Sequence, residues 1–321
     1  MKQLNILLLT MLFVLVSAGS PPPFTGSFNE VLDSLYSGNY QYALNATDSI
    51  ITEYPDSPAG HYLKVGIYSA YMSDFETDTL KDSLMEYAER ILEYSGDSAY
   101  DNFFKASALF QLSSFRAMQE DYIGALRYSK RSADFFNKTL RQDSTLYDAY
   151  LGQGIINYFT NKFRSRLPFF RSPDNGIADI RRAAQKGLFS YVPAYSMLAM
   201  LYMMDSKTDS ALIYIDSLRQ DYPCNRMFMY THYKIYYEDG QYSQALNVLR
   251  QLMDRVEETQ AGTYSNLIYV YYNTGLVFHE MNMDDSASVY LKKALDYRDT
   301  AADNKSRENI RKARQLYEKI R

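Results

Sequence analysis

The stretch VPAYSMLAMLYMMDSKTDSALIYIDSLRQDYPCN, residues 192–225, has the spacing of two short helices joined by a turn. Counted from Ala211, Tyr202 and Ala199 lie nine and twelve residues earlier, and Pro223 lies twelve residues later. Small side chains let two helices approach closely, and proline ends a helix because its nitrogen has no hydrogen to donate. One such hairpin cannot bury its own apolar face, so the spacing predicts further hairpins stacked beside it.

The same spacing returns along the chain. GNYQYALNATDSIITEYP at 38–55 and GQYSQALNVLRQLMDRVE at 240–257 share the order Gly-x-Tyr-x-x-Ala-Leu-Asn, and a later unit has Gly275 and Ala287 in the equivalent positions. The clearest units in register cover residues 24–57, 192–225, 226–259 and 268–301. Because each unit needs a neighbour to bury its apolar face, the repetition itself predicts the architecture.

This 34-residue pattern of aromatic, Leu, small residue, Tyr, Ala and Pro resembles the tetratricopeptide repeat (TPR) superfamily, whose members mostly bind other proteins. The resemblance implies an all-α, right-handed solenoid of about seven helical hairpins over residues 27–303, followed by a basic capping helix over 304–321. It is strong in the four units and weaker between Pro58 and Leu188.

In that middle region the hairpins are decorated. The helices expected there are 59–72 with 81–94 across the polar turn SDFETDT, 99–118 with 121–140, and 148–158 with 177–187 across an insertion at 160–175. Gly152 takes the small position of the last pair. Asn304 is the expected N-cap of the capping helix, with Ile310, Ala313, Leu316 and Tyr317 on one apolar stripe.

The first 20 residues, MKQLNILLLTMLFVLVSAGS, carry Lys2, an apolar run from 6 to 16 and then small residues. This order is typical of a signal peptide, here 1–18, and a Pro-rich leader follows at 19–26. The apolar run has about half of the roughly 20 residues that a membrane span needs. We therefore expect an exported mature chain without a transmembrane segment, in the periplasm or the extracellular space.

The 321 residues are 46% hydrophobic and 22% charged, a folded composition, and the net charge of −4 argues against a nucleic-acid partner. Residues 27–100 hold 13 acidic and 3 basic side chains, whereas 101–321 hold 25 and 30. The two parts could attract different surfaces or each other, or each could be a solvated face. The single Cys224 excludes an internal disulfide and is either a reactive or intermolecular thiol or a tolerated residue.

In the TPR superfamily the first helix of each repeat lines a concave groove. The resemblance places these residues on it: Met200, Met203, Met204, Met227, Tyr230, Lys234, Tyr237, Tyr269, Tyr272 and His279. Met adapts its shape and Tyr gives a large contact area, so this groove suits a protein or peptide partner. Alternatively, it binds a glycan or small ligand by stacking, or the side chains pack between repeats. The family's Lys/Asn/Arg carboxylate clamp is replaced by Met, Tyr and Glu, which argues against recognition of chaperone tails.

The insertion TNKFRSRLPFFRSPDNG, residues 160–176, interleaves cations and aromatic rings. Its members are Lys162, Phe163, Arg164, Arg166, Phe169, Phe170 and Arg171. As a second contact loop it would favour an anionic partner such as a phosphate-bearing lipid, a polyanionic glycan or an acidic protein face. The alternative is that the three Phe rings fill a gap beside an irregular turn.

Catalytic chemistry finds no support in the motifs. His61, His232 and His279 are isolated, and the sequence has no HExxH, GxSxG or phosphate-binding glycine loop. We therefore predict no enzyme activity, no cofactor and no metal site. The sequence predicts an exported, non-catalytic binding or scaffold protein.

Overall fold

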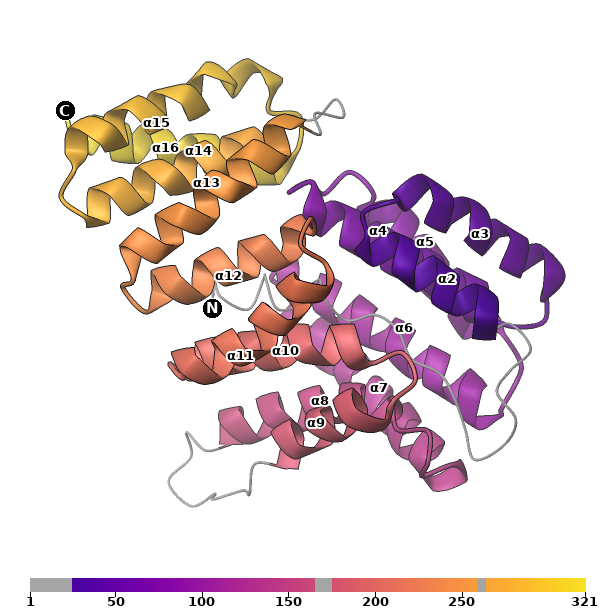
Figure 1. Ribbon diagram of the computed structural model, residues 1–321. Helices are drawn as coiled ribbons and strands as arrows, with labels where there is room; N and C mark the ends of the chain where they lie inside the picture. The colour runs from indigo at the N-terminus through magenta and orange to yellow at the C-terminus, as the bar shows by residue number, and fades with distance from the viewer. Residues whose placement is uncertain (1–24, 165–174, 259–263) are drawn as a thin grey trace. The chain divides into compact units, whose positions relative to one another are not determined.

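The computed structural model describes residues 25–164, 175–258 and 264–321, and within them all regular structure is helical (Figure 1). The helices are α2 (Thr25–Tyr36), α3 (Tyr40–Glu53), α4 (Ala59–Asp74), α5 (Lys81–Glu93), α6 (Ala99–Met118), α7 (Tyr122–Gln142), α8 (Ala149–Arg164), α9 (Asn175–Lys186), α10 (Tyr191–Met204), α11 (Thr208–Asp221), α12 (Arg226–Glu238), α13 (Tyr242–Glu258), α14 (Ser265–Glu280), α15 (Asp284–Asp296), the 3₁₀ turn η1 (Arg298–Thr300) and α16 (Asn304–Lys319). The predicted fold class, an all-α helical repeat of the solenoid type, is confirmed. The predicted signal peptide lies outside the described residues.

Consecutive helices pair as hairpins, seven in the described part of the chain, and α16 follows the last pair. Packed side chains join the two helices of each pair. Tyr68 of α4 meets Tyr87 of α5 with ring centroids 5.8 Å apart, and Tyr202 of α10 stacks on Tyr214 of α11 at the same separation. Each helix thus buries the face that its own residues make apolar, as the repeat spacing requires.

Glycines allow the closest helix contacts. A Cβ on Gly275 of α14 would lie 2.7 Å from the Leu291 side chain of α15, so Gly275 takes the small position as predicted. In α8 the prediction was wrong by two residues, because Gly154 and not Gly152 takes the small position. A Cβ on Gly154 would lie 2.7 Å from the Gly176 carbonyl of α9, whereas Gly152 faces the Phe136 ring of the preceding helix.

The hairpin turns share one backbone conformation. Six turn residues have positive φ: Gly38, Glu76, Glu120, Ser206, Gly240 and Asn282. Glycine adopts this conformation without a steric penalty, whereas in other L-residues it raises the conformational free energy by roughly 1–2 kcal/mol. Four of the six residues are not glycine and adopt the conformation despite this penalty. The packing of the two helices therefore imposes the turn, and a glycine in the sequence is not required.

The chain divides into two compact units. Of the described residues, unit 1 holds those up to Ser69 and from Asp82 to Leu198, and unit 2 holds those in 70–81 and 199–321. In unit 1, the Tyr62 ring packs against Phe103 and Phe104 with centroids 5.9 and 5.1 Å apart.

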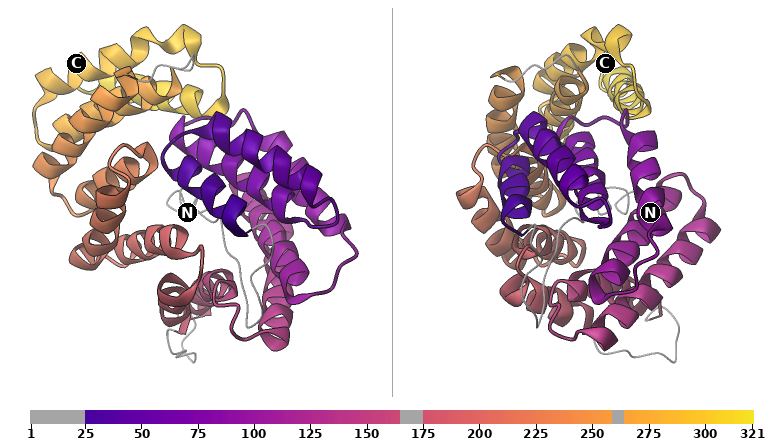
Figure 2. Two further views of the ribbon diagram at one scale, coloured as in Figure 1. Left: turned by 45° about the vertical axis from the view of Figure 1, so that its right-hand side comes forward. Right: turned by 90° about the vertical axis from the view of Figure 1, so that its right-hand side faces the viewer.

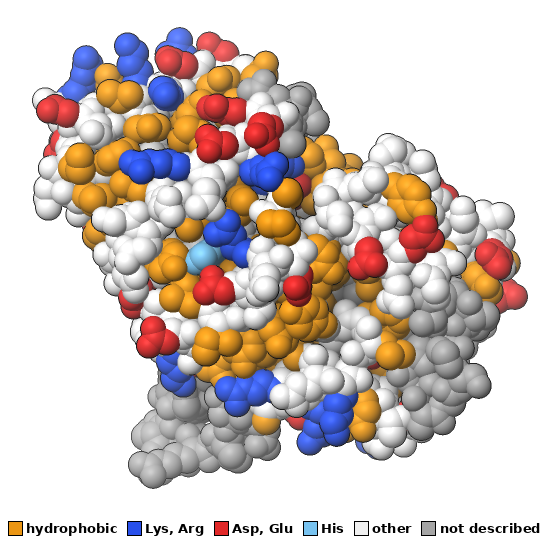
Figure 3. Space-filling model, viewed as in Figure 1, with side chains coloured by type: hydrophobic (Ala, Val, Ile, Leu, Met, Phe, Trp, Pro, Cys, Tyr) orange, Lys and Arg blue, Asp and Glu red, His pale blue; other side chains and the backbone are white. Residues whose placement is uncertain are grey.

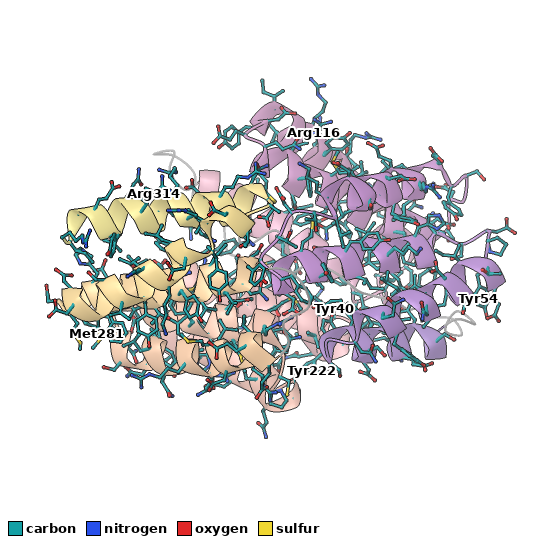
Figure 4. All side chains as sticks on the ribbon, turned by 90° about the horizontal axis from the view of Figure 1, so that it is seen from above. Tyr40, Tyr54, Arg116, Tyr222, Met281 and Arg314 are labelled. Carbon is teal, nitrogen blue, oxygen red and sulfur yellow. The ribbon has the colours of Figure 1, made fainter. Side chains whose placement is uncertain are left out.

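The core of unit 2 is built from α12 to α16, and α14, α15 and α16 lie side by side in both views of Figure 2. Ile310 and Ala313 of α16 are buried, and Leu316 and Tyr317 pack on the same core, as the predicted stripe requires. The N-cap is Asp303, whose carboxylate accepts from the Ser306 N–H at 2.8 Å, and not the predicted Asn304. Arg314 lies on the exposed face (Figure 4).

Asp148, directly before α8, has a buried carboxylate that accepts hydrogen bonds from the segment between α9 and α10. It accepts hydrogen bonds from the N–H groups of Leu188 and Phe189, at 3.2 and 3.3 Å, and from the Ser190 hydroxyl. A Cβ on Gly187 would lie 2.1 Å from the carboxylate, so only glycine fits beside it. Burial raises the pKa of Asp148 to about 7 against the lowering effect of these hydrogen bonds.

We expect Asp148 to make the protein less stable as the pH rises from about 4 to about 7. Its native pKa lies above the unfolded value of 3.8, so the native state binds more protons in this window. The stabilisation is complete below the unfolded pKa and is lost as the pH passes the native pKa, a change of about 4 kcal/mol. Urea denaturation across this range measures it.

The control compares two isosteric changes in unit 1. Asp148→Asn should remove most of the pH slope that Asp148 contributes, whereas Asp134→Asn, at an exposed position of α7, should leave the slope unchanged. Equal slopes for wild type and Asp148→Asn would show that Asp148 is ionised throughout.

Candidate functional site

Helices α12 and α14 present several of the predicted groove residues to one surface of unit 2. Tyr230 and Lys234 lie one turn apart on α12, and Tyr269 lies on α14. The rings of Tyr230 and Tyr269 meet edge to face with centroids 5.1 Å apart, and both residues are buried. Together with Arg226 and Asn266, these residues form what we call the α12–α14 surface.

A segment of the same chain, residues 74–77, lies on the α12–α14 surface. Arg226 donates two parallel hydrogen bonds to the Asp74 carboxylate, Nε to Oδ1 at 2.9 Å and Nη2 to Oδ2 at 2.8 Å. The two side chains are only 9% and 7% exposed, so this charge pair is desolvated. Such bidentate contacts between Arg and a carboxylate are strong and directional.

The main chain of the segment is bound as well. The carbonyl oxygen of Asp74 accepts from the Tyr230 hydroxyl at 3.3 Å and from Asn266 Nδ2 at 3.1 Å. Next along the segment, the guanidinium of Arg226 lies over the Phe75 ring, 4.6 Å from its centroid. Arg226 therefore binds the carboxylate and the aromatic ring of adjacent residues at once.

Glu76 and Thr77 extend the contact to the start of α16. Lys305 Nζ lies 2.7 Å from Glu76 Oε2, and the Thr77 hydroxyl donates to Asp303 Oδ2 at 3.3 Å. Ser265, the first residue of α14, donates to the same Asp303 oxygen at 2.8 Å. All four residues of the segment are buried, so its polar groups depend on these partners.

Burial and the carboxylates of the segment shift the pKa values of the surrounding groups. Burial lowers the pKa of Lys234 to about 8, and the negative charge of Glu76 opposes this effect. Burial, and then the same charge, raise the pKa values of the Tyr230 and Tyr269 hydroxyls. The Tyr hydroxyls are therefore neutral donors at physiological pH.

Comparisons with known proteins concern the fold. No family model and no curated protein matches the sequence. Solved structures that are similar include a tetratricopeptide repeat protein from Parabacteroides merdae, with 13% identity, coverage of 90% of this chain and 99% of that one, and a TM-score of 0.43. NprR in complex with its cognate peptide NprX shows 14% identity, 92% and 84% coverage and a TM-score of 0.43. The C-terminal part of a TPR repeat-containing protein from Cytophaga hutchinsonii shows 13% identity, 88% and 99% coverage and a TM-score of 0.42.

The chain's own features are the 34-residue spacing of four units and the helical hairpins, of which α8–α9 and α14–α15 have glycines at their close contacts. The described part of the chain is an all-α protein built from helical hairpins.

The other predicted groove residues are placed as follows. Met200 and Met227 are buried, and Met203 and Met204 are half-buried at the end of α10. Tyr237 and Tyr272 are half-buried, and Tyr272 lies close enough to act electrostatically on the Tyr237 hydroxyl. His279 pairs with Asp284 at 2.6 Å beside the α14–α15 turn. The structure thus gathers Tyr230, Lys234 and Tyr269 around the bound segment.

The predicted second contact loop lies mostly outside the described residues, which exclude Arg166, Phe169, Phe170 and Arg171 and the side chains of Phe163 and Arg164. Lys162 is described, and its Nζ hydrogen-bonds the Tyr158 hydroxyl at 2.9 Å on the same helix.

Sequence reasoning missed four parts of this site, namely Arg226, Asn266, Lys305 and the segment 74–77 itself. The available signal was the charge imbalance, since the acid-rich part of the chain supplies Asp74 and Glu76 and the more basic part supplies their partners. Of the three interpretations of that imbalance, attraction between the two parts holds at these pairs. Over α12 to α15, the outer face in Figure 3 shows acidic and basic groups interspersed.

Three further observations bear on the sequence predictions. No group of three or more His, Cys, Asp and Glu in the described ranges is arranged to hold a metal ion. None of the helices among those residues combines the length and apolar character of a membrane span. Cys224 is exposed, with its Sγ 3.0 Å from Arg255 Nη2.

Proposed function

We propose that the protein is an exported, non-catalytic scaffold that captures a protein or peptide partner on the α12–α14 surface. The observation that carries this proposal is the bound segment 74–77. A surface that holds a stretch of polypeptide through both side-chain and main-chain groups has the chemistry that a peptide partner needs. Export is inferred from the signal-peptide pattern of residues 1–18, with the periplasm or the extracellular space as destination.

The half-buried rings of Tyr237 and Tyr272 extend the proposed contact beyond the bound segment. Tyr rings contribute strongly to protein interfaces because they bury a large area at a low entropy cost. We further propose that the cationic and aromatic residues of 160–175 form a second contact.

Affinity capture tests the proposed function. The chain from residue 19 onward is used to recover partners from the envelope fraction of its own cells, with mass spectrometry of proteins and a parallel glycan and lipid analysis. We expect one protein to be recovered reproducibly. The double variant Tyr237→Ala/Tyr272→Ala should recover it at least ten times less well, about 1.4 kcal/mol or more of binding free energy.

The matched control is Tyr122→Ala, at a 51% exposed tyrosine of unit 1, which should leave capture unchanged. Circular dichroism of all variants checks that the helical fold is kept. Undiminished capture by the double variant would exclude Tyr237 and Tyr272 from the contact with the partner. Recovery of a glycan without protein would favour the alternative, in which the same Tyr rings stack on sugars.

A further inference from the structure

The segment 74–77 is more than a connection between helices. In five hairpins the turn residue with positive φ is followed two residues later by the next helix, as Gly240 is by Tyr242. In the second hairpin Glu76 has the same backbone conformation, but α5 begins only at Lys81. Residues 77–80 therefore precede α5, and Thr77, the first of them, donates to Asp303 at the start of α16.

The side-chain contacts of Arg226 and Lys305 recognise three consecutive residues of the segment. Arg226 binds a carboxylate at the first position and an aromatic ring at the second, and Lys305 binds a carboxylate at the third. Tyr230 and Asn266 bind the main-chain carbonyl of the first residue, which any peptide supplies. The surface therefore matches the order Asp, aromatic residue, Glu within a peptide.

We propose that the α12–α14 surface recognises an acidic peptide segment of a partner protein with the order Asp–aromatic–Glu, and that residues 74–77 occupy the surface as an internal competitor. This inference rests on the proposed function and names the chemistry of the partner. Exchange of one segment for the other preserves every buried charge pair, because each carboxylate that leaves is replaced by another. No cation is then left buried and unpaired, which would be the main cost of opening the site.

The internal segment has a high effective concentration because it is tethered. An added peptide gains access only in the fraction of molecules whose own segment has left, so its apparent affinity is reduced by that fraction. Weakening the internal segment should therefore strengthen binding of the external peptide.

The experiment uses a labelled, end-blocked peptide with the sequence of residues 73–79, SDFETDT, and the folded chain. The release variant Asp74→Asn/Glu76→Gln removes both negative charges from the internal segment. We expect it to bind the peptide at least ten times more tightly than wild type does. Lys305→Glu added to the release variant should abolish the gain, and a neutral peptide, SNFQTNT, should not bind.

Asp78→Asn is the matched control, since it removes a charge from the same turn while the contacts of residues 74–77 are kept, and it should behave as wild type. A second measurement needs no variant. Saturating peptide added to wild type should increase hydrogen exchange at the Thr77 amide, which bonds the Met72 carbonyl at 3.0 Å. This measurement decides the question if the release variant does not fold.

The outcomes separate the two proposals. In one outcome, the release variant captures the envelope partner but does not bind the acidic peptide, and hydrogen exchange at the Thr77 amide of wild type is unchanged by the peptide. This outcome would overturn the inference and leave the proposed function intact. Loss of both partner capture and peptide binding in folded protein would overturn both.

Discussion

Arg226→Ala is expected to lower the free energy of unfolding of unit 2 by about 3 to 5 kcal/mol. The substitution leaves the Asp74 carboxylate in a site where it is only 7% exposed and without its bidentate partner. It also removes the cation from the face of Phe75. Because the chain has no Trp, denaturant unfolding is best followed by far-UV circular dichroism.

The same pair offers a stricter test. Replacement of both partners by apolar residues, Arg226→Met with Asp74→Leu, should recover at least half of the loss because neither charge then remains buried alone. Arg250→Ala, at an exposed position of α13, should change stability by less than about 0.5 kcal/mol. An Arg226→Ala variant within about 1 kcal/mol of wild type would contradict the burial of this pair, since exposed pairs are worth no more than that.

Gly176→Ala is expected to destabilise unit 1 by about 2 to 3 kcal/mol. The new Cβ would lie 2.5 Å from the Gly154 carbonyl oxygen and 2.6 Å from the Tyr158 nitrogen. Both neighbours are backbone atoms of α8, which cannot move as a flexible side chain does. The helices α8 and α9 must therefore separate. Alanine gains roughly 0.5 to 1 kcal/mol over glycine in a helix, which offsets only part of the cost.

The matched control for Gly176 is Gly26, since each is the second residue of its helix and no atom lies within 4 Å of a Cβ built on Gly26. Gly26→Ala should be neutral or stabilising by up to about 1 kcal/mol. Thermal unfolding followed by circular dichroism compares the two. A Gly176→Ala protein as stable as the Gly26→Ala protein would show that the two helices do not approach so closely.

Local sequence predicted the helices of this protein well because a hairpin is specified by residues close together in the chain. The small position at Gly275, the Ala of the following helix and the turn between them act within one repeat. Differences of one residue, as at the Asp303 N-cap, fall within the usual uncertainty of helix ends. The assignment of Gly152 was wrong because two glycines in one helix face different neighbours, and only packing distinguishes them.

The candidate site was predicted in part. Tyr230, Lys234 and Tyr269 follow from the position of each residue within its repeat, a periodic property. Their partner does not, because Asp74 and Arg226 are 152 residues apart and no spacing rule connects them. The turn SDFETDT has the composition of a solvated loop, yet four of its residues are buried.

The sequence by itself determined the helical repeat, since each hairpin is encoded by residues close together in the chain and its apolar face requires neighbours. It also determined which helices carry the Tyr-rich and Met-rich positions. Only the tertiary structure decided what lies on them. A buried ion pair forms where two distant segments are brought together and desolvated, and that depends on the packing of whole helices, which local spacing does not encode.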